Sequence, residues 1–202
     1  MQYIKTIAAA LCVAVHTSPL SADMSWDGFY MGVSLDAART NASIAGTTTH
    51  SRKSESASVG AYAGFNRTTQ KGLVWGGEIG PSSIESAPNL SGGGLCTSQF
   101  SGKVLITPRL RAGFATGNLF LYGTAGLAIT DAVVRPASST DKDYAIGVTY
   151  GVGAELGLGN NWFTRLDLTR TDSGQSAQIF NGQTRDTIVK MDRITLGLTK
   201  KF

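Results

Sequence analysis

The side chains on which most enzymes and metal sites depend are scarce in this chain. It has two histidines, His16 and His50, and two cysteines, Cys12 and Cys96. Histidine is the commonest general base and metal ligand, and zinc sites combine several histidines and cysteines. His16 and Cys12 also lie in a segment that we expect to be removed. The sequence therefore predicts no catalytic residue, no metal ligand and no cofactor, and it leaves Cys96 without a disulfide partner.

The segment in question is a predicted signal peptide at residues 1–22. It has one lysine, Lys5, then an apolar stretch from Thr6 to Val15, and then Pro19 ahead of the small residue Ala22. A short apolar run with these flanks is typical of a secretory signal and is too short to span a membrane as a helix. Without Lys5 the mature domain, residues 23–202, has 17 basic and 14 acidic residues, a net charge of +3.

A second set of reactive side chains is more organised. Charged residues recur in phase with glycine, serine and threonine on one face of alternating segments. They comprise four acids and four arginines, namely Asp36, Glu78, Glu155, Asp167, Arg109, Arg111, Arg165 and Arg193. If this face lined the interior of a small barrel, the charges would be confined together and would have to pair. We therefore predict a charge network in the lumen.

The segments that would position these charges alternate apolar and polar residues with the period of two typical of β-strands. They span residues 26–39, 55–66, 73–81, 99–114, 119–130, 146–157, 162–169 and 187–202. Polar stretches predict long loops at 40–54, 82–98, 131–142 and 172–186, and short turns are predicted at 67–72, 115–118 and 159–161. Pro108 lacks a backbone donor and predicts a local bulge.

The connections alternate between long and short, which is typical of transmembrane β-barrels with an even number of strands. A soluble sandwich or a lipocalin-like barrel with an apolar interior remains an alternative. Two features favour the membrane. Glycines crowd the polar face at 147, 151, 153 and 157, as a narrow interior requires. Aromatic residues gather beside the short turns and predict an interfacial belt, comprising Trp26, Phe29, Phe65, Trp75, Phe114, Phe120, Tyr122, Trp162, Phe163 and Phe202. The predicted fold is an all-β, eight-stranded, antiparallel up-and-down transmembrane barrel.

Several short segments carry a resemblance. They are WDGFYMG at 26–32, GAYAGFN at 60–66, PRLRAGF at 108–114, LYGTAGLA at 121–128 and the last strand. Together they resemble small alphaproteobacterial outer-membrane proteins with an OmpA-like eight-stranded barrel, a group of porin-family barrels and surface antigens. The resemblance implies termini in the periplasm, surface loops, and recognition of Ile194, Leu196, Leu198 and Phe202 by the barrel-insertion machinery. Lys200 departs from the usual apolar residue of this signal.

The resemblance implies a non-enzymatic protein of the cell outer membrane of a Gram-negative bacterium, with roles in envelope structure and surface display. Outer-membrane lipid and lipopolysaccharide are expected partners, and nucleic acid is not. Alternatives are a small passive pore, or a surface adhesin or ligand-binding protein that uses loops 40–54, 82–98, 131–142 and 172–186. An enzyme that modifies lipid A is a weaker alternative, because His50 is its only candidate base. Haem binding is disfavoured for the same reason.

Overall fold

The computed structural model describes residues 25–44, 50–69, 71–83, 90–91, 97–98, 104–132, 143–180 and 183–202. The predicted signal peptide, residues 1–22, lies outside these ranges. No helix in the described ranges is long and apolar enough to cross a membrane.

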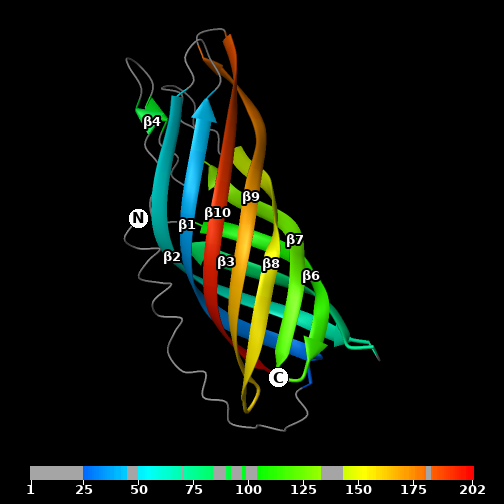
Figure 1. The fold of residues 1–202 in the computed structure, drawn as a ribbon. Helices are drawn as coiled ribbons and strands as arrows, with labels where there is room; N and C mark the ends of the chain where they lie inside the picture. Colours follow the sequence, from blue (N-terminus) through cyan, green and yellow to red (C-terminus); the bar gives the residue numbers. More distant parts are fainter. Residues whose placement is uncertain are drawn as a thin grey trace.

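Eight long strands pair into one closed antiparallel barrel (Figure 1). In pairing order they are β1 (Gly28–Ile44), β10 (Gln183–Lys201), β9 (Trp162–Phe180), β8 (Asp143–Gly159), β7 (Leu119–Ala132), β6 (Val104–Thr116), β3 (Leu73–Ser83) and β2 (His50–Thr68). Pairing of β1 with β10, from Tyr30 opposite Lys201 to Ile44 opposite Thr187, closes the ring. Two short strands, β4 (Leu90–Ser91) and β5 (Thr97–Ser98), form a separate sheet. The predicted eight-stranded barrel is confirmed.

The barrel is taller on one side than on the other. Strands β1, β2, β8, β9 and β10 have 17 to 19 residues, whereas β3, β6 and β7 have 11 to 14. Figure 1 shows β1, β2, β9 and β10 rising above the other strands. The predicted loops at 40–54 and 172–186 are therefore wrong over most of their length, because β1 and β2 pair as far as Ile44 and His50, and β9 and β10 as far as Phe180 and Gln183.

The other predicted connections are closer to the structure. β3 continues to Ser83 and β7 to Ala132, and residues 133–142 lie outside the described ranges, as does most of 84–103. At the opposite end, Asn160 and Asn161 both have positive φ, 50° and 62°. That is the backbone of a two-residue hairpin turn that matches the strand twist, so the predicted turn at 159–161 is confirmed.

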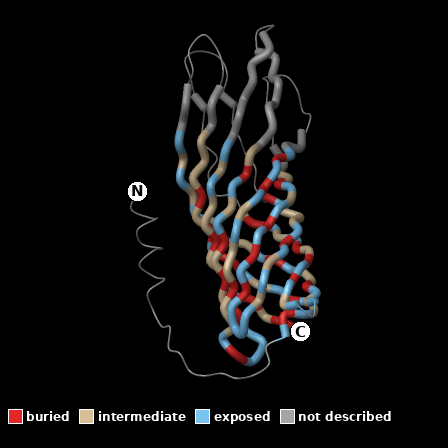
Figure 2. Tube along the Cα trace, turned by 45° about the vertical axis from the view of Figure 1, so that its right-hand side comes forward, coloured by how far each residue is buried: buried red, intermediate tan, exposed pale blue. Residues whose placement is uncertain are grey.

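Along each strand, buried and exposed residues alternate, and Figure 2 shows this pattern around the lower barrel. Large apolar residues point outward, among them Val33, Leu110 and Val152, while polar and small residues point inward. The bulge expected at Pro108 is absent. Pro108 faces Ile79 in an unshifted register with β3, and the registers of the described strands shift instead at Thr187/Val189 and at Gly157/Gly159.

Candidate functional site

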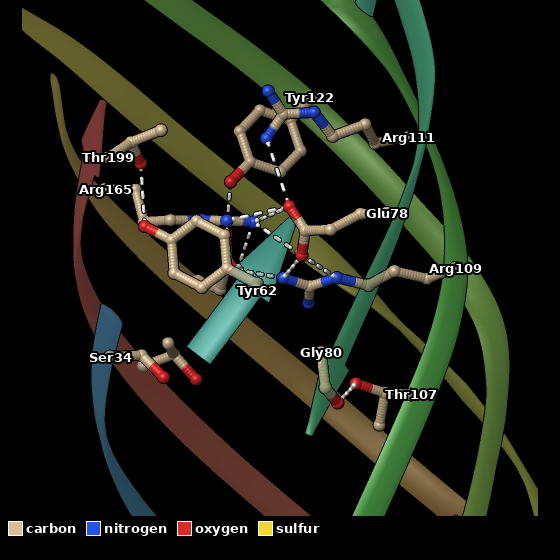
Figure 3. A network of polar contacts seen from close by, with 12 residues as sticks. Ser34, Tyr62, Glu78, Gly80, Thr107, Arg109, Arg111, Tyr122, Arg165 and Thr199 are labelled. Atoms are coloured by element: carbon tan, nitrogen blue, oxygen red, sulfur yellow. Dashed lines mark hydrogen bonds and ion pairs between the residues drawn. The ribbon is translucent and has the colours of Figure 1, made fainter. Parts of the chain in front are cut away.

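The interior of the lower barrel holds a compact group of charged side chains. Six of the eight residues in the predicted network meet there, and we call them the charge cluster: Glu78 from β3, Arg109 and Arg111 from β6, Glu155 from β8, and Arg165 and Asp167 from β9. The strands contribute them at alternate positions, so side chains that are two residues apart enter the same space. Figure 3 shows Glu78 lying between the ends of Arg109 and Arg165.

Glu78 is the centre of the cluster. Arg109 donates from Nε and Nη2 to Glu78 Oε1 at 2.8 and 2.5 Å. Arg165 donates from Nη1 and Nη2 to Glu78 Oε2 at 2.8 and 2.9 Å, and Tyr30 donates its hydroxyl to the same oxygen at 2.9 Å. A third guanidinium, that of Arg111, lies 3.7 Å away. One carboxylate on β3 therefore holds an arginine from the neighbouring strand β6 and another from β9, on the opposite side of the barrel.

The other two acids complete the cluster. Asp167 Oδ2 accepts from Arg109 at 2.9 Å and lies 3.2 Å from Arg165 Nη2, while its Oδ1 accepts from Tyr122. Glu155 binds Arg111 in a bidentate pair with distances of 3.1 and 3.0 Å. Three arginines and three carboxylates leave the cluster formally neutral, and charge-assisted pairs of this geometry offset the cost of burying each ion.

Tyrosine rings pack directly on the arginines. The Arg165 guanidinium carbon lies 4.1 Å from the centre of the Tyr62 ring, and that of Arg111 lies 4.5 Å from the Tyr30 ring. Such cation–π contacts are strongest away from water. Glycines make room for the rings, because a side chain at Gly153 would collide with Asp167 and with the Tyr122 ring. The tyrosines occupy the same inward phase as the charges, and that phase was the signal that could have identified them.

The remaining two predicted residues lie apart from the cluster. Asp36 is buried and accepts hydrogen bonds from Thr195 at 2.5 Å and from Ser34 at 3.4 Å. Arg193 is half-buried, and its contact is with Met191 Sδ at 3.9 Å. Within the described residues, neither side chain forms an ion pair. Both positions share the inward phase, but they lie on β1 and β10, which contribute no residue to the charge cluster.

An aromatic cluster fills the interior below the charges. It comprises Trp26, Val74, Phe120, Tyr122 and Phe163. The Trp26 ring lies 5.3 Å from that of Phe120 and 4.9 Å from that of Phe163. This corrects the predicted aromatic belt, because these four aromatic residues belong to the inward phase. Of the other predicted members, Phe29, Trp75, Phe114, Trp162 and Phe202 are exposed on the outer wall, and Phe65 is half-exposed beside the Phe29 ring.

The residues that precede β1 run beneath the barrel and bind it. Trp26 donates its indole N–H to the carbonyl of Gly117 at 3.3 Å, and Asp27 accepts from the backbone of Thr68. From the other end of the domain, Lys201 donates to the carbonyl of Ser25 at 2.9 Å, and its Nζ lies 5.2 Å from the Trp26 ring. Residues 25–27 thereby seal the aromatic cluster from below.

The residues predicted to signal insertion lie on the outer wall. Leu198 and Phe202 are exposed, Ile194 and Leu196 are half-exposed, and all four are in the outward phase of β10. The backbone N–H of Phe202 donates to Phe29 O at 2.9 Å, at the seam between β1 and β10.

The residues relevant to the enzymatic alternatives fall elsewhere. The side chain of His50 and the whole of Cys96 lie outside the described part of the chain. Among the described residues, no group of three or more histidine, cysteine, aspartate or glutamate side chains could hold a metal ion. Each acid of the charge cluster accepts hydrogen bonds from arginine or tyrosine side chains.

Known proteins share both the sequence and the shape of this barrel. The chain is 32% identical over 156 residues to the 22 kDa outer membrane protein of Rhizobium leguminosarum, covering 77% of this chain and 68% of that protein. It is 29% identical over 160 residues to the 31 kDa outer-membrane immunogenic protein of Brucella melitensis, covering 71% and 65%. The chain therefore spans about two thirds of the length of these relatives.

Among solved structures, Neisserial surface protein A superposes with a TM-score of 0.51 at 19% identity, covering 87% of this chain and 97% of that one. This likeness concerns the fold. A family model, the outer membrane protein beta-barrel domain, matches residues 7–202. The closed eight-stranded barrel, its apolar outer wall and this match together show that the chain belongs to the outer membrane protein beta-barrel domain family.

Proposed function

We propose that this protein is a non-enzymatic structural barrel of the outer membrane whose lumen is closed and whose long strands display their ends at the cell surface. The observation that carries the proposal is the charge cluster, which joins β3, β6, β8 and β9 across the interior. An eight-stranded barrel is just wide enough for its own side chains, so a neutral cluster held on several sides leaves little space for a solute.

The aromatic cluster supports the same proposal at a second level. Trp26, Phe120 and Phe163 pack below the charges, and residues 25–27 cover them. An ion that passed the charge cluster would next meet an apolar layer, where an unpaired charge is costly. Two successive barriers of different chemistry favour a structural role over the passive pore.

We further propose that both ends of the domain lie in the periplasm. The opposite end of the barrel, where β1, β2, β9 and β10 rise above the other strands, then faces the cell exterior. Short turns are typical of the periplasmic end of such barrels. The turn at Asn160 and Asn161, the start of β1 and the end of β10 share one end of the barrel, as Figure 1 shows for the turn and for the C-terminus. The Brucella relative is named an immunogenic protein, which agrees with a surface-exposed end.

Liposome swelling tests the closed lumen directly. Vesicles that contain the refolded protein are diluted into isotonic solutions of small sugars, and their light scattering is followed over time. The proposal expects the swelling rate of protein-free vesicles. Rapid swelling with arabinose, comparable to that of a general porin, would refute a closed lumen and favour passive diffusion.

The non-enzymatic part of the proposal needs its own test. Mass spectrometry of lipid A from cells with and without the protein should show identical species. A reproducible loss or gain of an acyl chain would favour the enzymatic alternative, and His50→Ala would then identify its base.

Phe202 is proposed as a contact for the barrel-insertion machinery. Its ring is 68% exposed at the β1–β10 seam, so it is free to meet a partner before the seam closes. Replacing it by aspartate should lower the yield of folded protein in the outer membrane, measured by heat-modifiable gel mobility. The control is Leu158→Asp, because Leu158 points outward from β8 and is 53% exposed. Equal yields for the two variants would show that Phe202 carries no special signal.

A further inference from the structure

The outer wall of four neighbouring strands changes character at one cross-strand row. Strands β2, β1, β10 and β9 place Ala57, Ala37, Ile194 and Leu168 side by side in register. The next outward row consists of Glu55, Arg39, Asp192 and Arg170, and the row beyond it of Lys53, Asn41, Lys190 and Asp172. The apolar wall therefore ends along a straight boundary, and charged residues begin immediately beyond it.

The cations of these two rows, which we call the polar rows, keep most of their donors free. Arg170 lies 3.6 Å from both Asp172 and Asp192, which is too far for a hydrogen bond. Lys53 and Lys190 are exposed and form no ion pair among the described residues. Arg39 is the exception, with one hydrogen bond to Glu55 at 2.9 Å. Exposed pairs of this kind add little to stability, so folding alone does not account for four cations here.

The other end of the same wall differs. There the cation on β10, Lys200, donates to the Asn160 carbonyl at 2.7 Å and lies 5.1 Å from the Trp162 ring. Arg67 on β2 lies 5.8 Å from the Phe65 ring. Lys200 and Arg67 are thus occupied by groups of the protein itself, whereas the cations of the polar rows are available to a partner outside it.

We infer that the polar rows bind the phosphate groups of lipid A, with the acyl chains lying on the adjoining apolar wall. An occupant of this face must place anions against Arg39, Lys53, Arg170 and Lys190 and hydrocarbon against Val33, Leu35 and Leu198, which are exposed just below. Arginine and lysine are the usual phosphate ligands, and arginine donates in pairs. The choice of lipid A rests on the proposed function, because the polar rows lie at the outer leaflet only if both ends of the domain are in the periplasm.

Native mass spectrometry of the refolded protein in detergent tests this site. The probes are diphosphorylated lipid A, the same lipid A with both phosphates removed, phosphatidylglycerol and inorganic phosphate. The test variant is Lys53→Gln/Arg170→Gln/Lys190→Gln. The matched control, Arg67→Gln/Lys71→Gln/Lys200→Gln, removes the same charge at the other end. Folding of each variant is verified by heat-modifiable gel mobility.

We expect diphosphorylated lipid A to bind the unmodified protein and the control equally. The test variant should bind it roughly tenfold or more weakly, because three cations that attract the phosphates are removed. Binding to the unmodified protein should weaken with added salt. Equal binding by the test variant, or equal binding of dephosphorylated lipid A, would overturn the inference. Equal binding of phosphatidylglycerol or inorganic phosphate would also overturn it, in favour of a general phosphate site. Because binding in detergent depends on neither orientation nor conductance, its failure is separate from failure of the closed lumen.

Discussion

The barrel carries two groups of ion pairs that use the same residue types in opposite settings. In the charge cluster, Glu78 lies 2.5 Å from Arg109 and 2.8 Å from Arg165, and its side chain is 1% exposed. In the polar rows, Arg170 lies 3.6 Å from Asp192, and the two side chains are 43% and 52% exposed. The groups differ in the face of the strand on which they lie. Strand phase thus decides whether a charge holds the barrel together or remains available to a partner.

The largest effect is expected from Glu78→Ala. This change leaves Arg109 and Arg165 buried without their main carboxylate, and removing one member of a buried pair costs about 3–5 kcal/mol. Urea unfolding of the refolded protein, followed by tryptophan fluorescence, measures the loss. Asp192→Ala in the polar rows should cost less than about 1 kcal/mol. Similar losses for both variants would abolish the distinction between the two groups.

Trp26→Ala should have the next largest effect, because it removes the centre of the aromatic cluster. Truncation of a buried tryptophan typically costs about 3–5 kcal/mol. The outward Trp75 is 54% exposed and has neighbours on one side, so Trp75→Ala in the same urea assay should cost clearly less. A larger loss at Trp75 would indicate that lipid-facing packing dominates stability.

Gly153→Ala and Gly123→Ala compare the two faces with a single methyl group. At Gly153 the methyl group would collide with Asp167 and the Tyr122 ring, whereas at Gly123 its nearest neighbour is 3.9 Å away. Overpacking of this kind costs about 1–3 kcal/mol, so we expect that loss at Gly153 and almost none at Gly123. Thermal unfolding midpoints in detergent distinguish the outcomes, and equal midpoints would argue against close packing around Asp167.

The smallest effect is expected from a double-mutant cycle in the polar rows. The coupling free energy between Arg170 and Asp192 should be below about 1 kcal/mol and should vanish in high salt, because the pair is exposed. The same cycle for Arg111 and Glu155, a buried bidentate pair, should give a larger value that salt hardly changes. If high salt instead abolished the coupling between Arg111 and Glu155 and left that between Arg170 and Asp192 unchanged, the outward-facing pair would be the strong one.

The strands and their phase could be predicted from the sequence because a membrane imposes a period of two on the outer wall. That constraint ends where the strands leave the membrane, so the continuations of β1, β2, β9 and β10 lack an apolar face and their polar sequences predict loops. Pairing there is held by backbone hydrogen bonds, which depend little on the type of side chain.

For the candidate site, inward phase identified the six residues of the charge cluster. Phase does not show how far along a strand each residue lies, because strand tilt and register set that distance, and so it does not separate Asp36 and Arg193 from the others. The predicted aromatic belt is wrong for Trp26, Phe120, Tyr122 and Phe163, because nearness to a turn does not show which face of a strand a residue occupies.

The proposed function requires that the charge cluster and the aromatic cluster close the lumen. The most direct test is single-channel recording of the purified protein in planar bilayers, beside Glu78→Gln and the exposed control Asp192→Asn. We predict no steady conductance for the unmodified protein or the control. Glu78→Gln should show brief, small openings, because Arg109 and Arg165 each lose the carboxylate that they share. A large, steady conductance from the unmodified protein would show that the lumen is open.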